Sequence, residues 1–170
     1  EAIDLMSKAK KPVFYTGGGV INSGPEASHL LKELVTLTGF PITSTLMGLG
    51  AFPANNDQWL GMLGMHGTYE ANMSMHDSDL IINIGARFDD RVTGRLDAFS
   101  PNSKKIHVDI DPSSIGKNIK VDLAIVSDVS NLLKALLKRF KEKNKNFLDS
   151  NKEKTSQWWS QISKWREKKS

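Results

Sequence analysis

Two arginines and two aspartates stand among small residues in residues 85–94, which read GARFDDRVTG. An arginine guanidinium offers paired donors that suit a phosphate, and an aspartate accepts hydrogen bonds from hydroxyl groups. Gly85 lets the backbone come close to a ligand because it has no side chain. The segment therefore indicates a site for an anionic ligand with a ribose. A solvated loop with surface ion pairs is the alternative that its composition leaves open.

Three other glycine-rich segments, residues 17–19, 45–50 and 63–67, follow predicted strands or precede a predicted helix. The first could turn backbone N–H groups toward a phosphate, but Asn22 stands where a dinucleotide fingerprint has its third glycine. A plain turn between strand and helix explains it equally well. Met47 and Met65 would suit a flat heteroaromatic ring, since sulfur packs well on aromatic faces, although core packing would also explain a single methionine.

Acidic residues mark the ends of two further predicted elements. Asp109 ends a strand, where carboxylates often accept from ribose hydroxyls, and Asp128 opens a long helix, where an N-cap is the more economical interpretation. The four histidines show no metal-ligand spacing, no nucleophile elbow is present, and a lone His66 is more often structural than catalytic. We therefore predict binding rather than reaction, with no catalytic residue and no metal site.

The spacing of apolar residues predicts alternating helices and strands. We expect helices near 2–9, over 25–38, near 69–75 and from Asp128 through Phe140; strands at 13–16, 42–44, 80–84, 106–110 and 123–126; and a long ordered loop at 46–65. This alternation predicts an α/β fold, a parallel sheet with helices on both faces. In such sheets ligands bind beyond the carboxyl ends of the strands.

Composition is that of one soluble domain, with 170 residues, 39% apolar and 25% charged residues. No apolar stretch approaches the roughly 20 residues that span a bilayer, and the first residues do not resemble a signal peptide. Cysteine is absent, which excludes disulfides and thiolate chemistry and suits a reducing compartment. The net charge of +4 arises from residues 138–170, at +7, while residues 1–137 carry −3. We therefore expect neither a nucleic-acid nor a membrane partner.

The end of the chain changes in character after Phe140, where Lys, Asn and Ser predominate and an exposed linker is expected. Thr155 could then cap a last helix with Trp158, Trp159, Ile162 and Trp165 on one side. Side chains this large need a partner surface, which we expect outside the chain; packing on the same domain is the alternative. Because the chain also starts in a helix-like pattern without methionine, we expect it to be part of something longer.

These segments, taken in order, resemble the central domain of the catalytic subunit of acetolactate synthases, which are thiamine-diphosphate enzymes. The resemblance covers nearly the whole chain and is carried by residues 11–20, 45–50, 63–67, 85–94 and 107–112, of which 85–94 is the most specific. The tail at 158–165 resembles the stretch that leads into the third domain of these enzymes. We accordingly expect domain boundaries at 1–143 for the central domain and 144–170 for a linker and helix.

The resemblance implies a three-layer Rossmann-like domain with six parallel strands, a DHS-like NAD/FAD-binding fold, and FAD bound in an extended conformation without net redox change. By matching motif, the phosphates and ribitol would lie by Gly17, Gly18, Gly19 and Arg87. The flavin side would be lined by Thr45, Leu46, Met47, Leu63, Gly64, Met65 and His66, and the cleft completed by Gly85, Ala86, Asp89, Arg91 and Val92. The adenosine end would be held by Asp109, Ile110, Asp128 and Val129, and Met65, Asp90 and Arg91 match positions near the substrate channel.

The complete enzymes join two pyruvates, or pyruvate and 2-oxobutyrate, in branched-chain amino-acid synthesis. The resemblance implies thiamine diphosphate and Mg²⁺ held by other domains of the subunit, a homodimer or homotetramer, and a small regulatory subunit. It also implies a cytoplasmic location in bacteria, or a plastid or mitochondrion in eukaryotes. No Gly-Asp-Gly diphosphate motif occurs here, so the chain alone should be inactive. Ser127 stands where these enzymes commonly have a glycine before the aspartate. A glyoxylate carboligase or pyruvate oxidase domain, or a spacer without nucleotide, remains the alternative.

Overall fold

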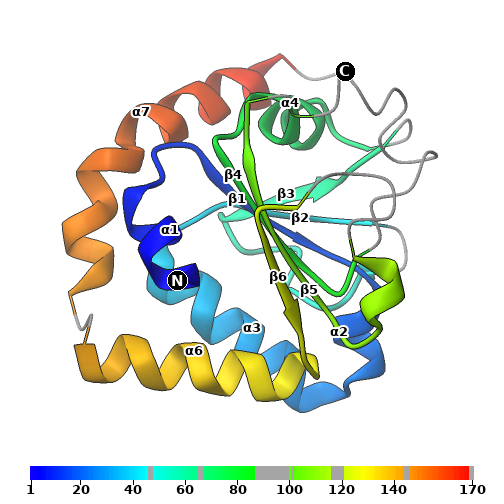
Figure 1. Ribbon diagram of the computed structural model, residues 1–170. Coiled ribbons are helices and arrows are strands. Elements are labelled where there is room, and N and C mark those ends of the chain that lie inside the picture. Colours follow the sequence, from blue (N-terminus) through cyan, green and yellow to red (C-terminus); the bar gives the residue numbers. More distant parts are fainter. Residues whose placement is uncertain are drawn as a thin grey trace.

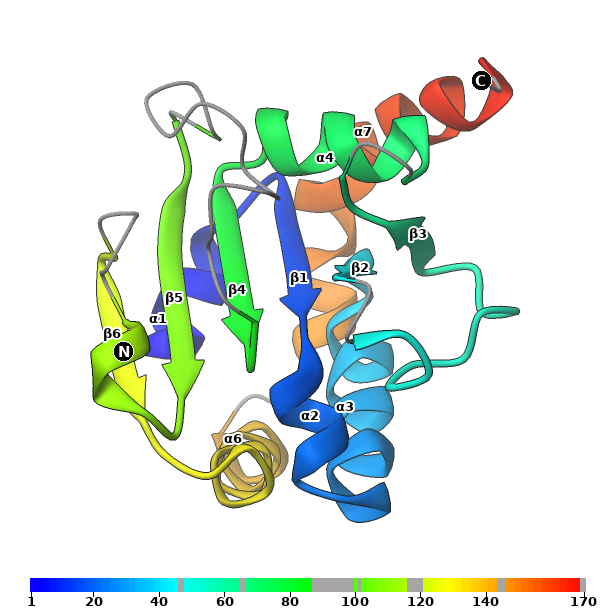
Figure 2. The ribbon, with the colours of Figure 1, turned by 90° about the vertical axis from the view of Figure 1, so that its right-hand side faces the viewer.

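A six-stranded sheet forms the centre of the computed structural model, which describes residues 1–45, 48–64, 67–86, 100, 102–115, 121–143 and 146–168. The strands are β1 (Pro12–Thr16), β2 (Ile42–Ser44), β3 (Trp59–Met62), β4 (Leu80–Ile84), β5 (Lys104–Asp109) and β6 (Leu123–Val126). They lie in the order β3-β2-β1-β4-β5-β6, and every pairing is parallel. In Figure 2 the arrows of β1, β4, β5 and β6 end at the same edge. The predicted parallel α/β sheet is confirmed.

Helices cover both faces of this sheet, as predicted. They are α1 (Ala2–Lys8), α2 (Gly18–Asn22), α3 (Pro25–Thr38), α4 (Tyr69–Asp77), α6 (Val129–Lys143) and α7 (Phe147–Glu167), with a short 3₁₀ turn at Pro112–Ser114. Helices α3 and α6 run side by side across one face (Figure 1). Met75 of α4 packs with Val13 and Ile81 on the opposite face. No helix in the described part of the chain is long and apolar enough to cross a membrane.

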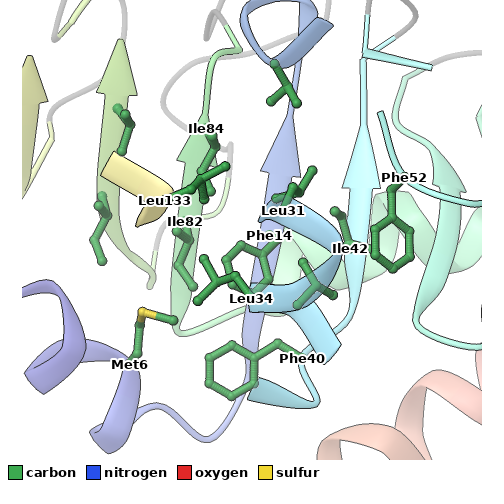
Figure 3. Close-up of a cluster of buried hydrophobic side chains, with 14 of the residues drawn as sticks. Met6, Phe14, Leu31, Leu34, Phe40, Ile42, Phe52, Ile82, Ile84 and Leu133 are labelled. Carbon is green, nitrogen blue, oxygen red and sulfur yellow. The ribbon is translucent and has the colours of Figure 1, made fainter. Parts of the chain in front are cut away.

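The larger hydrophobic core lies between the sheet and helices α3 and α6. Phe14 of β1 stands beside Ile42 and Ile82 in register, and all three side chains are buried. Leu31 and Leu34 of α3 cover them (Figure 3). Both strands β1 and β4 are buried along their whole length, which explains why their sequences are nearly continuous apolar runs. This packing fixes the positions of the loops that follow the strands.

Helix α7 corrects the prediction for the tail. It begins at Phe147 rather than at Thr155, which is buried within the helix and donates to the carbonyl of Asn151. Trp158 and Trp165 are buried with Leu60 of β3 in a cluster of this same domain. The expected partner surface is therefore supplied by the chain itself. The domain boundary at residue 143 stays a prediction.

Strand β3 lies where a loop was expected. It has four residues, and Gly61 has a φ of +99°, so its pattern is too short and irregular to stand out in the sequence. The guanidinium of Arg166 in α7 donates to the carbonyls of Asp57 and Trp59, at 2.7 and 3.1 Å. This contact covers one end of the edge strand. Helix α2, within the predicted glycine turn, was also not predicted.

Candidate functional site

The strand order reverses direction between β1 and β4, and this switch point is where open α/β sheets bind ligands. Backbone hydrogen bonds tie together the chain segments that follow the strands: Leu63 N–H to Ser44, Thr45 N–H to Thr16, Gly85 N–H to Val108 and Ser127 N–H to Asp109, at 2.9 to 3.1 Å. The described members of the predicted site thus lie along one edge. We call this line of segments the carboxyl edge.

Glycines at the switch point bring two turns into backbone contact. A Cβ atom on Gly19 would lie 2.8 Å from the Cα of Gly85, and one on Gly17 would lie 2.6 Å from the Cα of Ala86. Gly85 has a φ of +72°, which L side chains rarely adopt. Larger residues at these three positions would therefore force the turns after β1 and β4 apart.

The N–H groups of Gly17 and Gly19 form hydrogen bonds within the protein. Gly17 donates to the carbonyl of Ile84 at 3.3 Å, and Gly19 donates to that of Gly85 at 3.0 Å. These two N–H groups are therefore used within the protein, and the position of the glycine turns beside a phosphate stays a prediction. Gly18, which lies between these two residues, is the first residue of α2.

Two asparagines that the sequence analysis did not single out hold turns of the carboxyl edge. The Asn83 carboxamide accepts from the N–H of Ala86 and donates to its carbonyl, both at 2.9 Å. Asn72 of α4 makes the same pair of bonds with Gly64, at 3.0 and 2.9 Å. A sequence signal existed for Asn83, because it is the polar residue inside the apolar run of β4.

His107 stands beside Asn83 in the register between β4 and β5, and its side chain is buried. Burial lowers the pKa of its imidazole below the usual value, opposed by the nearby Asp109 carboxylate and by hydrogen bonding with the Ala86 backbone. The Nε2 atom lies 3.7 Å from a carboxylate oxygen of Asp109. His107 is thus a neutral group at neutral pH that contacts the same turn as Asn83.

The predicted adenosine end lies after β5 and β6. Asp109 accepts from the N–H of Asp111 at 3.0 Å, which leaves its carboxylate further acceptor positions. Asp128 caps α6, accepting from the N–H of Asn131 at 3.1 Å, and its other oxygen lies 3.4 Å from the hydroxyl of Ser23. The N-cap interpretation of Asp128 is confirmed. Val129 is buried, and so its side chain serves the core.

Large apolar side chains are exposed along this edge. Ile110 follows β5 with 69% of its surface accessible, and Val126 ends β6 at 56%. Ile21 of α2 and Leu49, beyond β2, are also exposed. Of the exposed large apolar side chains in the described ranges, only Leu148 of α7 lies elsewhere. Exposed groups of this kind suit the faces of planar rings.

Nine predicted site residues lie outside the described residues: Leu46, Met47, Met65, His66, Arg87, Asp89, Asp90, Arg91 and Val92. Thr45, Leu63, Gly64, Gly85 and Ala86 are described and lie on the carboxyl edge. Among the residues that the structure describes, no three carboxylate or histidine side chains gather as a metal site would require.

The sequence matches known proteins along most of its length. The family model for the thiamine pyrophosphate enzyme central domain matches residues 1–136. The acetolactate synthase large subunit of Buchnera aphidicola subsp. Schizaphis graminum is 48% identical over 100% of this chain, and the acetolactate synthase isozyme 3 large subunit of Escherichia coli is 46% identical over 97% of it. An acetolactate synthase of Mycobacterium bovis is 53% identical over 81% of it. The alignments cover 28%, 28% and 22% of those proteins. The chain therefore belongs to the family of thiamine pyrophosphate enzyme central domains.

Proposed function

We propose that this chain is the central domain of an acetolactate synthase large subunit and that it binds FAD, extended along the carboxyl edge. The observation that carries the proposal is the order of the segments across the sheet. Leu63 and Thr45, predicted for the flavin side, follow β3 and β2. The glycine turns predicted for the phosphates follow β1 and β4, and Asp109, predicted for the adenosine end, closes β5.

The described residues fit such a ligand in shape and chemistry. Strands spaced about 4.8 Å apart make the six-stranded edge roughly 24 Å wide, which allows a dinucleotide to lie stretched out along it. Asp109 offers acceptor oxygens for ribose hydroxyls, and the exposed Ile110 next to it offers an apolar surface for a purine ring. Arg87, outside the described residues, is expected to pair with the phosphates.

The reaction itself would belong to the complete subunit. There, thiamine diphosphate and Mg²⁺ on other domains would carry the condensation of two 2-oxoacids, while FAD would undergo no net redox change. This domain would bind and orient the flavin nucleotide and contribute no catalytic residue. A homodimer or homotetramer, a small regulatory subunit and a cytoplasmic location in bacteria are parts of the same proposal.

Flavin content is the direct test. The complete protein is purified, denatured to release non-covalent ligands, and the supernatant is assayed for FAD by absorbance and chromatography. We expect stoichiometric FAD, or stoichiometric uptake of added FAD. A complete, folded protein that neither contains nor takes up FAD contradicts the proposal and favours a spacer domain.

A second measurement separates related enzymes. Arg87→Ala in the complete protein should weaken FAD binding by roughly 2–5 kcal/mol, because a desolvated phosphate loses its partner. The product formed from pyruvate then identifies the reaction. Acetolactate supports the proposal, whereas oxidative products, or a reaction with glyoxylate only, would assign the chain to a pyruvate oxidase or glyoxylate carboligase type.

A further inference from the structure

We propose that Asn72 and Asn83 are positioning residues, a pair of carboxamide clamps that fix the two turns between which the dinucleotide would lie. The inference rests on the proposed function, because it assigns these side chains a role toward the same ligand. Neither side chain is itself expected to touch the reacting atoms.

The two clamps share one geometry. In each, the carboxamide oxygen accepts from the N–H of one residue while the carboxamide nitrogen donates to the carbonyl of that same residue, over 2.9 to 3.0 Å. Two parallel bonds to a single peptide residue fix its orientation as well as its position. They also determine which end of each carboxamide is oxygen.

The clamped turns have backbone conformations that need such support. Gly64 has a φ of +115°, and Gly85, directly before the clamped Ala86, has a φ of +72°. A glycine has access to many other conformations, so an external restraint must select these. A Cβ atom on Gly64 would meet no atom within 4 Å, so packing around that side does not supply the restraint.

The clamps hold different parts of the carboxyl edge. Asn72 reaches from α4 to the turn after β3, at the predicted flavin side. Asn83 lies in β4 and holds the turn after that strand, at the switch point. Two strands, β2 and β1, lie between β3 and β4. A ligand that extends from one turn to the other would therefore meet both turns in fixed positions.

Burial explains the strength of the Asn83 clamp. This side chain is fully buried in a strand whose other residues are all apolar, and an unpaired amide there would be strongly unfavourable. The side chain uses its hydrogen-bonding capacity on the turn outside the strand rather than on a neighbouring strand. The polar residue thus links the rigid core to the edge, which is what a positioning residue requires.

The test compares clamp variants with a matched control in the complete protein. Asn72→Leu and Asn83→Leu remove both bonds, and Asn72→Asp and Asn83→Asp keep the acceptor but lose the donor when ionised. Asn151→Leu is the control, since Asn151 is a buried asparagine of α7 that donates to Ser7. FAD affinity is measured by flavin fluorescence, together with the visible circular dichroism of the bound flavin. Amide hydrogen exchange at Gly64 and Ala86 is measured without ligand.

We expect the clamp variants to bind FAD at least tenfold more weakly and to alter the flavin signal, with faster exchange at the clamped amide. Asn151→Leu should lose stability without either change. The Asp variants keep the measurement possible if the Leu variants do not fold. Folded clamp variants with unchanged affinity and exchange overturn this inference alone, as does an equal effect of Asn151→Leu. A wild-type protein that takes up no FAD overturns the proposed function, and the ligand role of the clamps with it.

Discussion

The close contact between Gly19 and Gly85 shows how single residues determine the form of the carboxyl edge. Their backbones touch because neither has a side chain, and the N–H of Gly19 uses this proximity to bond to the carbonyl of Gly85. The pattern of glycines was visible in the sequence, but its reason was not. Spacing suggested either N–H groups directed at a ligand or a plain turn, and the structure adds that the N–H groups of Gly17 and Gly19 bond within the protein where the two turns pack on one another.

Gly19→Ala should destabilise the protein by about 1–3 kcal/mol, because the new Cβ would lie 2.8 Å from the Cα of Gly85 and one turn must move. The change occurs within α2, where alanine would otherwise favour the helix. Urea unfolding measures the loss, and Ser160→Ala on the exposed face of α7 serves as control. A stability equal to or above that of the wild type would disprove the close contact.

The buried His107 predicts a dependence of stability on pH. Because its pKa is lowered in the folded state, the unfolded chain binds the proton more readily, and stability should fall as the pH drops below about 6.5. The loss can reach roughly 1.4 kcal/mol per pH unit. Unfolding free energies at pH 7.5 and 5.5 should differ less in His107→Gln than in the wild type. The exposed His29→Gln is the control, and an unchanged difference in His107→Gln would refute this account.

At the scale of elements, much of the fold could be predicted because local patterns were strong. The strands at 42–44, 80–84 and 123–126 and the helix at 25–38 have the predicted bounds, since apolar or β-branched runs mark the strands and glycine and proline mark the ends of the helix. Elements with weak local signals were missed. Strand β3 is short and contains Gly61, and the start of α7 lies in a polar segment whose helix depends on tertiary contacts.

The candidate site likewise has parts that could be predicted from the sequence and parts that could not. Turns after predicted strands could be placed on one edge, because parallel strands share their direction. The clamps could not, since Asn72 meets Gly64 only through the packing of α4 on the sheet. For Asn83 the polar residue in an apolar strand was visible, but its partner Ala86 was not.

Helix α7 should be required for the stability of this domain. Trp158 donates from Nε1 to the carbonyl of Pro12, at 2.9 Å in a buried position at the start of β1. Trp158→Phe keeps an aromatic ring but removes the Nε1 donor and leaves that carbonyl unpaired, which should cost about 1–3 kcal/mol in urea unfolding. Trp159→Phe, whose bond to Gly39 is only partly buried, should cost less. A larger loss for Trp159→Phe would contradict the assignment.

In the molecule as a whole, the strands in the middle of the sheet should be the most stable against local opening. Strands β1 and β4 are paired on both sides and buried throughout, whereas β6 is paired only with β5 and alternates between half-buried and exposed residues. Opening of the edge strand should therefore require less free energy than opening of the centre.

Hydrogen exchange followed by NMR should show this gradient. The amides of Phe14 and Ile82 should exchange only through global unfolding, and those of β6 should exchange faster by at least tenfold. Equal protection of β6 and β4 would mean that the sheet opens as one unit.

The guanidinium of Arg166, bound to the carbonyls of Asp57 and Trp59, has a consequence for self-association. A sheet margin with free carbonyls can recruit a strand from another molecule, and a cation bonded there blocks that recruitment. The last turn of α7 thus covers the edge strand β3, which lies far from it in the sequence. A variant that lacks Arg166 should form oligomers or fibres at high protein concentration before any change in ligand affinity is detected.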